Sequence, residues 1–124
     1  IVHPRVRALA VDRFAALEAA DEPLACYEVP LLFENGLDQE LRPVVVVIAP
    51  EAACVARVAS RDSISRDQAH ARIRAQMHLA VKARLADYVV DNGGPPEATR
   101  RQADRVLDTI ARSLGLDPSL YPTP

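Results

Sequence analysis

The sequence predicts an α/β fold in which helices cover a small parallel sheet. Three observations predict it: an uncharged, mostly β-branched run at 44–49, a second short run at 88–90, and segments of helical periodicity around them. Strands that alternate with helices are typical of parallel sheets. A chain of 124 residues with 49% hydrophobic residues is expected to form one modest domain, or part of one.

The N-terminal part is expected to hold one helix and one strand. Apolar residues recur at helical spacing from His3 to Ala20, and Pro4 is tolerated in a first turn. The sequence at 21–23 ends this helix. We interpret the apolar run Leu24 to Phe33 as a buried strand.

The middle of the chain predicts a strand followed by two helices. The run Val44 to Ala49 indicates a central parallel strand, after which Pro50 opens a helix that continues to about Arg61. Ser65 and Gln68 have the spacing of a capping box, and we expect the helix that they open to extend into the mid-80s.

The C-terminal part predicts a last strand, a loop and a helix. Tyr88 to Val90 is the third expected strand, and the loop at 92–96 combines Asn, Gly and Pro. A helix from about Glu97 places apolar residues on one face and is expected to stop at Gly115. The tail beyond it is expected to be poorly ordered.

Composition excludes several classes of function. A net charge of −2 and an aromatic content of 4% argue against a nucleic-acid partner, because neither a basic surface nor a stacking platform is indicated. No apolar run is long enough to span a membrane. Cys26 and Cys54 form no metal or disulfide motif, which favours a reducing, cytoplasmic setting.

A basic segment is the first candidate site. Arg57, Arg61 and further basic residues up to Arg84 far outnumber the acidic residues Asp62 and Asp67. Arg57 and Arg61 are four residues apart on a predicted helix, so they share a face and could converge on one polyphosphate. The alternative is an ordinary solvated helix face with local ion pairs.

Two further candidates follow predicted strands. Asp91-Asn92-Gly93-Gly94 lies where parallel sheets bind ligands, although a tight turn needs the same residues. Glu34 ends the expected strand at 24–33 and could hold Mg²⁺ directly or through water, or could simply cap the next turn. His70 and His78 would lie about 12 Å apart along one helix, too far to share a metal.

Taken in order, several short motifs resemble dephospho-CoA kinases over residues 1 to about 115. They are His3-Pro4, Val29-Pro30-Leu31-Leu32-Phe33-Glu34, the strand 44–48, Arg57 with Arg61-Asp62, Gln76, and Asp91-Asn92-Gly93. The resemblance implies a kinase that transfers the γ-phosphate of ATP to the 3′-hydroxyl of dephospho-CoA with Mg²⁺. It also implies a three-layer P-loop kinase-like fold with a helical lid.

The resemblance also implies roles for segments and residues. Residues 1–23 would end the substrate region, with His3 facing dephospho-CoA, and residues 24–56 would form core strands. Residues 57–86 would form a lid whose Arg57 and Arg61 close over the phosphates of ATP. Residues 87–124 would hold the last core strand, an adenine-side loop at Asn92 and Gly93, and the C-terminal helix. Glu34 would lie near the magnesium.

The sequence departs from the family in one respect. No G-x-x-x-x-G-K-[ST] loop occurs in the 124 residues, and the acidic segment expected to hold the general base is absent too. We therefore expect the chain to be the C-terminal portion of such an enzyme, with the N-terminal strands missing and no activity alone. The alternatives are a non-catalytic module that binds polyanions or a protein partner, and another small-molecule P-loop kinase.

Overall fold

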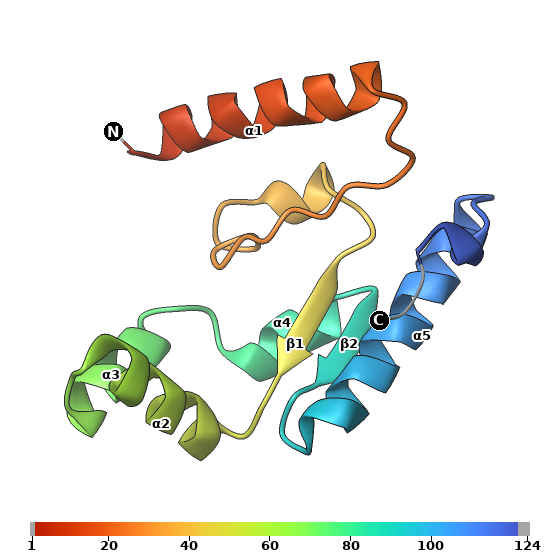
Figure 1. The fold of residues 1–124 in the computed structure, drawn as a ribbon. Helices are drawn as coiled ribbons and strands as arrows, with labels where there is room; N and C mark the ends of the chain where they lie inside the picture. The colour runs from red at the N-terminus through yellow and green to blue at the C-terminus, as the bar shows by residue number, and fades with distance from the viewer. Residues whose placement is uncertain (1, 122–124) are drawn as a thin grey trace.

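The computed structural model describes the backbone of residues 2–121 and the side chains of residues 5–121, as a two-stranded parallel sheet with helices around it (Figure 1). The α-helices are α1 (Val2–Ala19), α2 (Glu51–Asp62), α3 (Arg66–Arg74), α4 (Leu79–Leu85) and α5 (Pro96–Ser113). The strands are β1 (Val45–Ile48) and β2 (Tyr88–Asp91), and short 3₁₀ helices lie at η1 (Leu37–Gln39) and η2 (Pro118–Leu120). The α/β prediction is therefore confirmed, as are the strands expected at 44–49 and 88–90.

Each face of the sheet is covered over one strand only. Paired residues of neighbouring strands point to the same face, so Val46 lies beside Val89, and Val47 lies beside Val90 on the other face. Val46 is buried while Val89 is 39% exposed, and Val90 is buried while Val47 is 54% exposed. Since α4 packs against β1 and α5 against β2, these helices cover opposite faces. The arrangement has three layers, of which the outer two are incomplete in the described residues.

The strand expected at 24–33 does not form. Residues 24–29 run without a strand partner, and residues 30–36 form turns that lie between α1 and the sheet (Figure 1). Within this run Pro30 lacks the backbone N–H that a ladder needs, so the run cannot pair along its whole length. Glu34 consequently lies in a turn and not at the end of a strand.

The helix expected from Ser65 into the mid-80s is two helices. The capping box is present as predicted, with Ser65 Oγ accepting from Gln68 N–H and the Gln68 side chain accepting from Ser65 N–H. After α3 the chain breaks, and α4 begins where the Nδ1 atom of His78 accepts a hydrogen bond from Ala80 N–H at 3.2 Å. The Met77 N–H leaves the helical ladder and donates to the Glu34 carboxylate at 2.8 Å. A tertiary contact therefore overrides the helical periodicity, and the spacing of His70 and His78 along one helix does not apply.

The two terminal helices differ in how well their apolar faces are covered. Helix α1 agrees with the expected bounds, but Leu9 on it is 63% exposed. Helix α5 buries Ile110 and Ala111 and ends at Ser113, and the φ of +73° at Gly115 just beyond it lets Leu116 N–H donate back to Ala111 O. The chain then forms η2, which packs on α5, so the tail that we expected to be poorly ordered has regular structure at 118–120, while its residues 122–124 lie outside the described part of the chain.

Candidate functional site at the carboxyl edge of the sheet

The carboxyl ends of β1 and β2 lie at one edge of the sheet. Ile48 pairs with Asp91 in the parallel register, so Pro50 at the start of α2 and the loop after Asp91 leave the sheet together. Asn92 N–H extends the ladder by donating to Ile48 O at 2.7 Å. Open parallel sheets bind ligands beyond this edge. The candidate site is therefore built from the start of α2 and the loop at 91–94.

Arg57 on α2 reaches this loop. Its Nη2 atom donates to the backbone carbonyl of Asn92 at 3.0 Å, across 35 positions of sequence. The hydrogen bond brings together two residues that the resemblance assigned to ATP. A guanidinium has further N–H groups besides the one used here, and it remains charged at any physiological pH. Arg57 therefore brings positive charge and further N–H donors to the carboxyl edge of the sheet.

Gly93 is required by close packing in the loop. Its N–H donates to Asp91 Oδ1 at 2.7 Å, and a Cβ atom added at Gly93 would stand 2.8 Å from Cδ of Pro50. No heavy atom lies within 4 Å of the equivalent point at the neighbouring Gly94. The glycine thus lets the loop lie against the first residue of the α2 connection, which couples the two halves of the site.

Two side chains of α5 hold the same loop, and sequence reasoning missed both. The Gln102 carboxamide accepts from Asp91 N–H at 3.0 Å and donates to Asp91 O at 3.0 Å, so it pairs with the free edge of β2 as a neighbouring strand would. The Thr99 hydroxyl lies 3.2 Å from both Asp91 O and Asn92 Oδ1, so its single hydrogen can be donated to either oxygen. Thr99 and Gln102 are three residues apart and so share one face of α5. This spacing could have pointed to them only if the loop at 91–94 had already been known to lie against that face.

Arg61 does not join Arg57 in this structure. Its side chain is 75% exposed and pairs with Asp62 at 2.7 Å, and Arg72 from α3 binds the other oxygen of Asp62 at 2.6 Å. The hydrogen bond from Arg61 is the largest influence on Asp62 and lowers the pKa of that carboxyl. The two guanidinium groups expected to converge thus bind different partners here, with Arg61 in a local ion pair.

Glu34 lies against the opposite end of the basic segment. Its Oε1 atom is 2.8 Å from the Lys82 ammonium and also accepts from Met77 N–H. Gln76, which belongs to the resemblance, precedes Met77 in the same break between α3 and α4. Within residues 5–121 no group of three His, Cys, Asp or Glu side chains is placed to hold a metal ion. The magnesium role of Glu34 therefore stays a prediction.

The substrate side predicted at the N-terminus is only partly described. His3 lies in the first turn of α1, and its side chain falls outside the described residues, so its role stays a prediction. A cavity of 350 Å³ lies between α1 and residues 25–27, lined mainly by apolar side chains that include Phe14 and Tyr27. These two rings meet edge to face with centroids 5.9 Å apart, which fixes the segment to the helix.

Comparison with known proteins decides the family. The model of the dephospho-CoA kinase family matches residues 1–97. This chain belongs to the dephospho-CoA kinase family. A dephospho-CoA kinase of Anaeromyxobacter dehalogenans is 45% identical over 93% of the chain and 54% of its own length. One from Syntrophotalea carbinolica is 43% identical over 90% of the chain and 52% of its own length. The chain spans about half the length of these relatives.

Solved structures agree with the family assignment. The Thermus thermophilus protein TT1252 superposes with a TM-score of 0.75 at 37% identity, over 89% of this chain and 56% of that one. A dephospho-CoA kinase from Campylobacter jejuni gives 0.59 at 27% identity, over 90% and 55% of the two chains. The dephospho-CoA kinase fold thus accounts for the parallel strands and the helices around them. Among residues 2–121, no helix is both long and apolar enough to cross a membrane.

Proposed function

We propose that this chain supplies the lid and the adenine-side loop of an enzyme that phosphorylates the 3′-hydroxyl of dephospho-CoA with ATP. The hydrogen bond from Arg57 to Asn92 is the observation that carries the proposal, because it joins the basic helix to the loop at the ligand-binding edge of the sheet. Family membership supplies the reaction class, and the geometry supplies the residues. The product is coenzyme A.

The segments divide according to this role. Residues 1–23 end the substrate region, 24–56 lead through the core, 57–86 form the lid, and 87–124 carry the last strand, the adenine-side loop and the C-terminal helix. The half-covered sheet supports a P-loop kinase-like fold to which further strands and helices add, since Val47 and Val89 leave apolar surface on both faces. His3 faces dephospho-CoA in this proposal.

The lid contributes to the reaction through the positive charge of its arginines. Phosphoryl transfer depends on positioning the groups and stabilising charge on the transferred oxygens, and arginines close to those oxygens do both. Arg57 already lies at the edge of the sheet, and Arg61 joins it once a phosphate competes with Asp62. The loop that cradles the phosphates is not among these 124 residues, so the reaction needs a P-loop and a general base that this chain does not hold.

Mg²⁺ belongs to the proposal through the family. Mg²⁺ in kinases is held by one or two carboxylates together with water and phosphate oxygens. Glu34 is the carboxylate assigned to it, but the Lys82 ammonium and the Met77 amide already bind its Oε1 atom. The described residues thus do not form a magnesium site on their own, and we derive no step through the metal. We further propose a cytoplasmic setting and no nucleic-acid or membrane partner.

Arg57→Ala in the natural protein that contains this chain tests the proposal. We expect kcat/KM for ATP to fall by at least about tenfold, since a charge that stabilises the transferred phosphoryl group is lost. Arg112→Ala is the matched control, because Arg112 is an exposed arginine in the last turn of α5. An unchanged kcat/KM in Arg57→Ala removes Arg57 from the site.

The same protein distinguishes the alternative functions. Salt-dependent binding of generic polyanions without preference for ATP would favour the non-catalytic module. Faster phosphorylation of nucleosides or shikimate-like alcohols than of dephospho-CoA would favour another small-molecule kinase. We expect dephospho-CoA to be the preferred acceptor in direct competition.

A further inference from the structure

Lys82 is a charged side chain inside the structure. The residue is 8% exposed, although lysine is almost never buried unless it is paired. Its ammonium lies 2.8 Å from Glu34 Oε1 and donates to Pro30 O at 3.0 Å. Both partners come from the turns at 30–36, about 50 residues earlier in the chain. The lysine therefore fixes α4 to a segment that is remote in sequence.

The same carboxylate binds the break between α3 and α4. Met77 N–H donates to Glu34 Oε1 at 2.8 Å, so one oxygen atom receives a hydrogen bond from the break and an ion pair from α4. A helical residue would give its N–H to the preceding turn of the helix. The contact with Glu34 satisfies this donor where the helix is interrupted. It also fixes the position of the break between α3 and α4 relative to the turns at 30–36.

The chain enters and leaves the pair of helices α2 and α3 through two connections. The first is Pro50, which lies against Gly93, and the second is the break at 75–78, which lies against Glu34 in the turns at 30–36. The side chain of Arg57 makes a further contact from α2 to Asn92 O. Between these two connections α2 and α3 pack on each other. Hinges are a few residues at the ends of elements that absorb a change of backbone angle. The break at 75–78 has this position with respect to the basic helices.

We propose that Glu34 and Lys82 are positioning residues that anchor the break at 75–78, the second connection of the lid. The anchor keeps Arg57 and Arg61 in position to bind the nucleotide. The inference rests on the proposed function and deepens it. It assigns Glu34 a role different from binding magnesium, because its charge is neutralised by Lys82 and its oxygen is used by Met77. Pro30 O and Met77 N–H are the backbone groups through which the anchor acts.

The electrostatics of Glu34 agree with this anchor. Burial by itself raises the pKa of this carboxyl, but the hydrogen bond from Lys82 and those from backbone amides outweigh it and hold the pKa below its ordinary value. Glu34 is therefore an anion that Lys82 needs as a partner. Removing one member of a buried pair is costly because it leaves the other charge without compensation.

Three variants of the natural protein test the anchor. Glu34→Gln removes the charge and keeps an oxygen that accepts from Met77 N–H, Lys82→Met removes the ammonium and keeps the length of the side chain, and the double variant removes both charges. Hydrogen exchange of the Met77 amide is the first measurement, and kcat and KM for ATP are the second. Circular dichroism and a urea midpoint establish that each variant is folded.

We expect each single variant to exchange the Met77 amide at least about tenfold faster, because an unpaired buried charge opens the connection. We expect kcat and KM for ATP to worsen together, as is usual for hinge residues. The double variant should recover exchange to within about threefold of the natural protein, since an apolar and a neutral side chain can replace a buried ion pair. This rescue is the result that a magnesium ligand would not show.

Two results would overturn the anchor. One is unchanged Met77 exchange in both single variants. The other is a magnesium phenotype: the double variant shows kcat and KM values as impaired as those of Glu34→Gln and requires more Mg²⁺ than the natural protein. In that case Lys82→Met would keep the exchange rate and the kinetic constants of the natural protein. Because amide exchange does not depend on turnover, the anchor and the kinase reaction can fail separately. If the double variant recovers exchange but the natural protein does not phosphorylate dephospho-CoA, the proposed function alone is refuted.

Discussion

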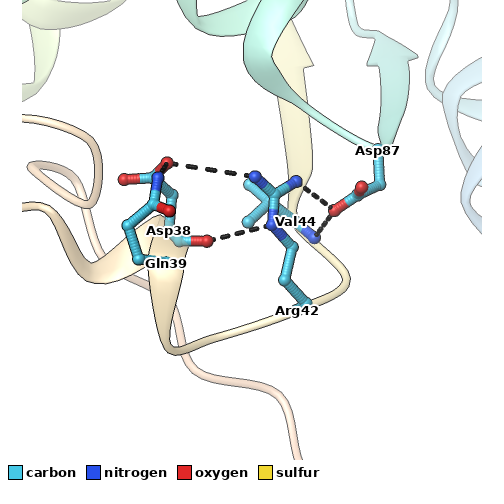
Figure 2. A network of polar contacts seen from close by, with 5 residues as sticks. All are labelled: Asp38, Gln39, Arg42, Val44 and Asp87. Atoms are coloured by element: carbon cyan, nitrogen blue, oxygen red, sulfur yellow. Dashed lines mark hydrogen bonds and ion pairs between the residues drawn. The ribbon is translucent and has the colours of Figure 1, made fainter.

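The carboxylate of Asp87 binds the guanidinium of Arg42 at 2.7 Å and also accepts from Val44 N–H at 2.6 Å (Figure 2). Arg42 in turn donates from Nε to Asp38 O at 2.9 Å. These contacts join the residues that precede β1 to the residue that precedes β2, at the edge of the sheet opposite the candidate site. One end of the strand pair is thus held by ionic contacts, and the other by hydrogen bonds from Arg57 and Gln102 to the loop at 91–94.

We expect this contact to make stability depend on pH. The hydrogen bond from Val44 N–H, followed by that from Arg42, lowers the pKa of Asp87 in the folded state. A lowered folded pKa contributes stability above the unfolded value of about 3.9, and this contribution is lost as the pH falls through the folded pKa. The thermal midpoint should therefore drop as the solution is acidified below about pH 4.

Asp87→Asn isolates this contribution. The amide oxygen can still accept from Val44 N–H, but the charge that Arg42 binds is lost. We expect the variant to melt below the natural protein at pH 7 and the difference to shrink toward zero at about pH 2. A difference that is independent of pH would show that Asp87 acts through packing alone.

Gly93→Ala and Gly94→Ala form a matched pair. The added Cβ at Gly93 would stand 2.8 Å from Cδ of Pro50, whereas the one at Gly94 meets no heavy atom within 4 Å. We expect Gly93→Ala to lower the free energy of unfolding by about 1–3 kcal/mol, because backbone or ring atoms must shift. Gly94→Ala should change it by no more than about 0.5 kcal/mol. Urea midpoints measure both, and equal effects would contradict the coupling of this loop to α2.

Gln102→Leu should loosen the loop from the side of α5. The variant loses both hydrogen bonds to Asp91, and we expect faster exchange of the Asp91 amide and a higher KM for ATP. Gln102→Glu keeps an acceptor for Asp91 N–H and loses the donor to Asp91 O. Its Asp91 exchange rate and its KM for ATP should therefore lie between those of the natural protein and those of Gln102→Leu. Arg105→Ala, an exposed change on the same helix, is the control. Unchanged exchange at Asp91 in Gln102→Leu would show that the carboxamide does not hold the loop.

The 124-residue chain alone should not phosphorylate dephospho-CoA. The arginines of the lid cannot replace the backbone cradle and the lysine of a P-loop, neither of which occurs in this sequence. A coupled assay with ATP, Mg²⁺ and dephospho-CoA measures the rate. The Anaeromyxobacter dehalogenans dephospho-CoA kinase, which is 45% identical, serves as the positive control. Turnover above background would refute the expectation.

Local signals were enough to predict most of the elements. The uncharged run before Ala49 predicts β1 because consecutive β-branched residues favour the extended backbone of a strand, and the spacing of Ser65 and Gln68 predicts the start of α3. The stop of α5 just before Gly115 follows from the left-handed conformation that glycine adopts readily. The sequence motifs also identified the family. These features depend on residues close together in the chain.

Contacts between remote residues were decided only by the tertiary structure. Periodicity predicts a continuous helix through Met77, yet that amide bonds to Glu34. The apolar run at 24–33 forms no strand, and its residues from Pro30 onward form turns. Likewise, nothing local shows that Arg57 reaches Asn92 or that Gln102 closes the edge of β2. The sequence by itself determined where β1, β2, α1, α2 and α5 form, and where α3 begins. Where buried donors and charges find partners depends on which segments meet in space, and this decided the break at 75–78 and the shape of the site.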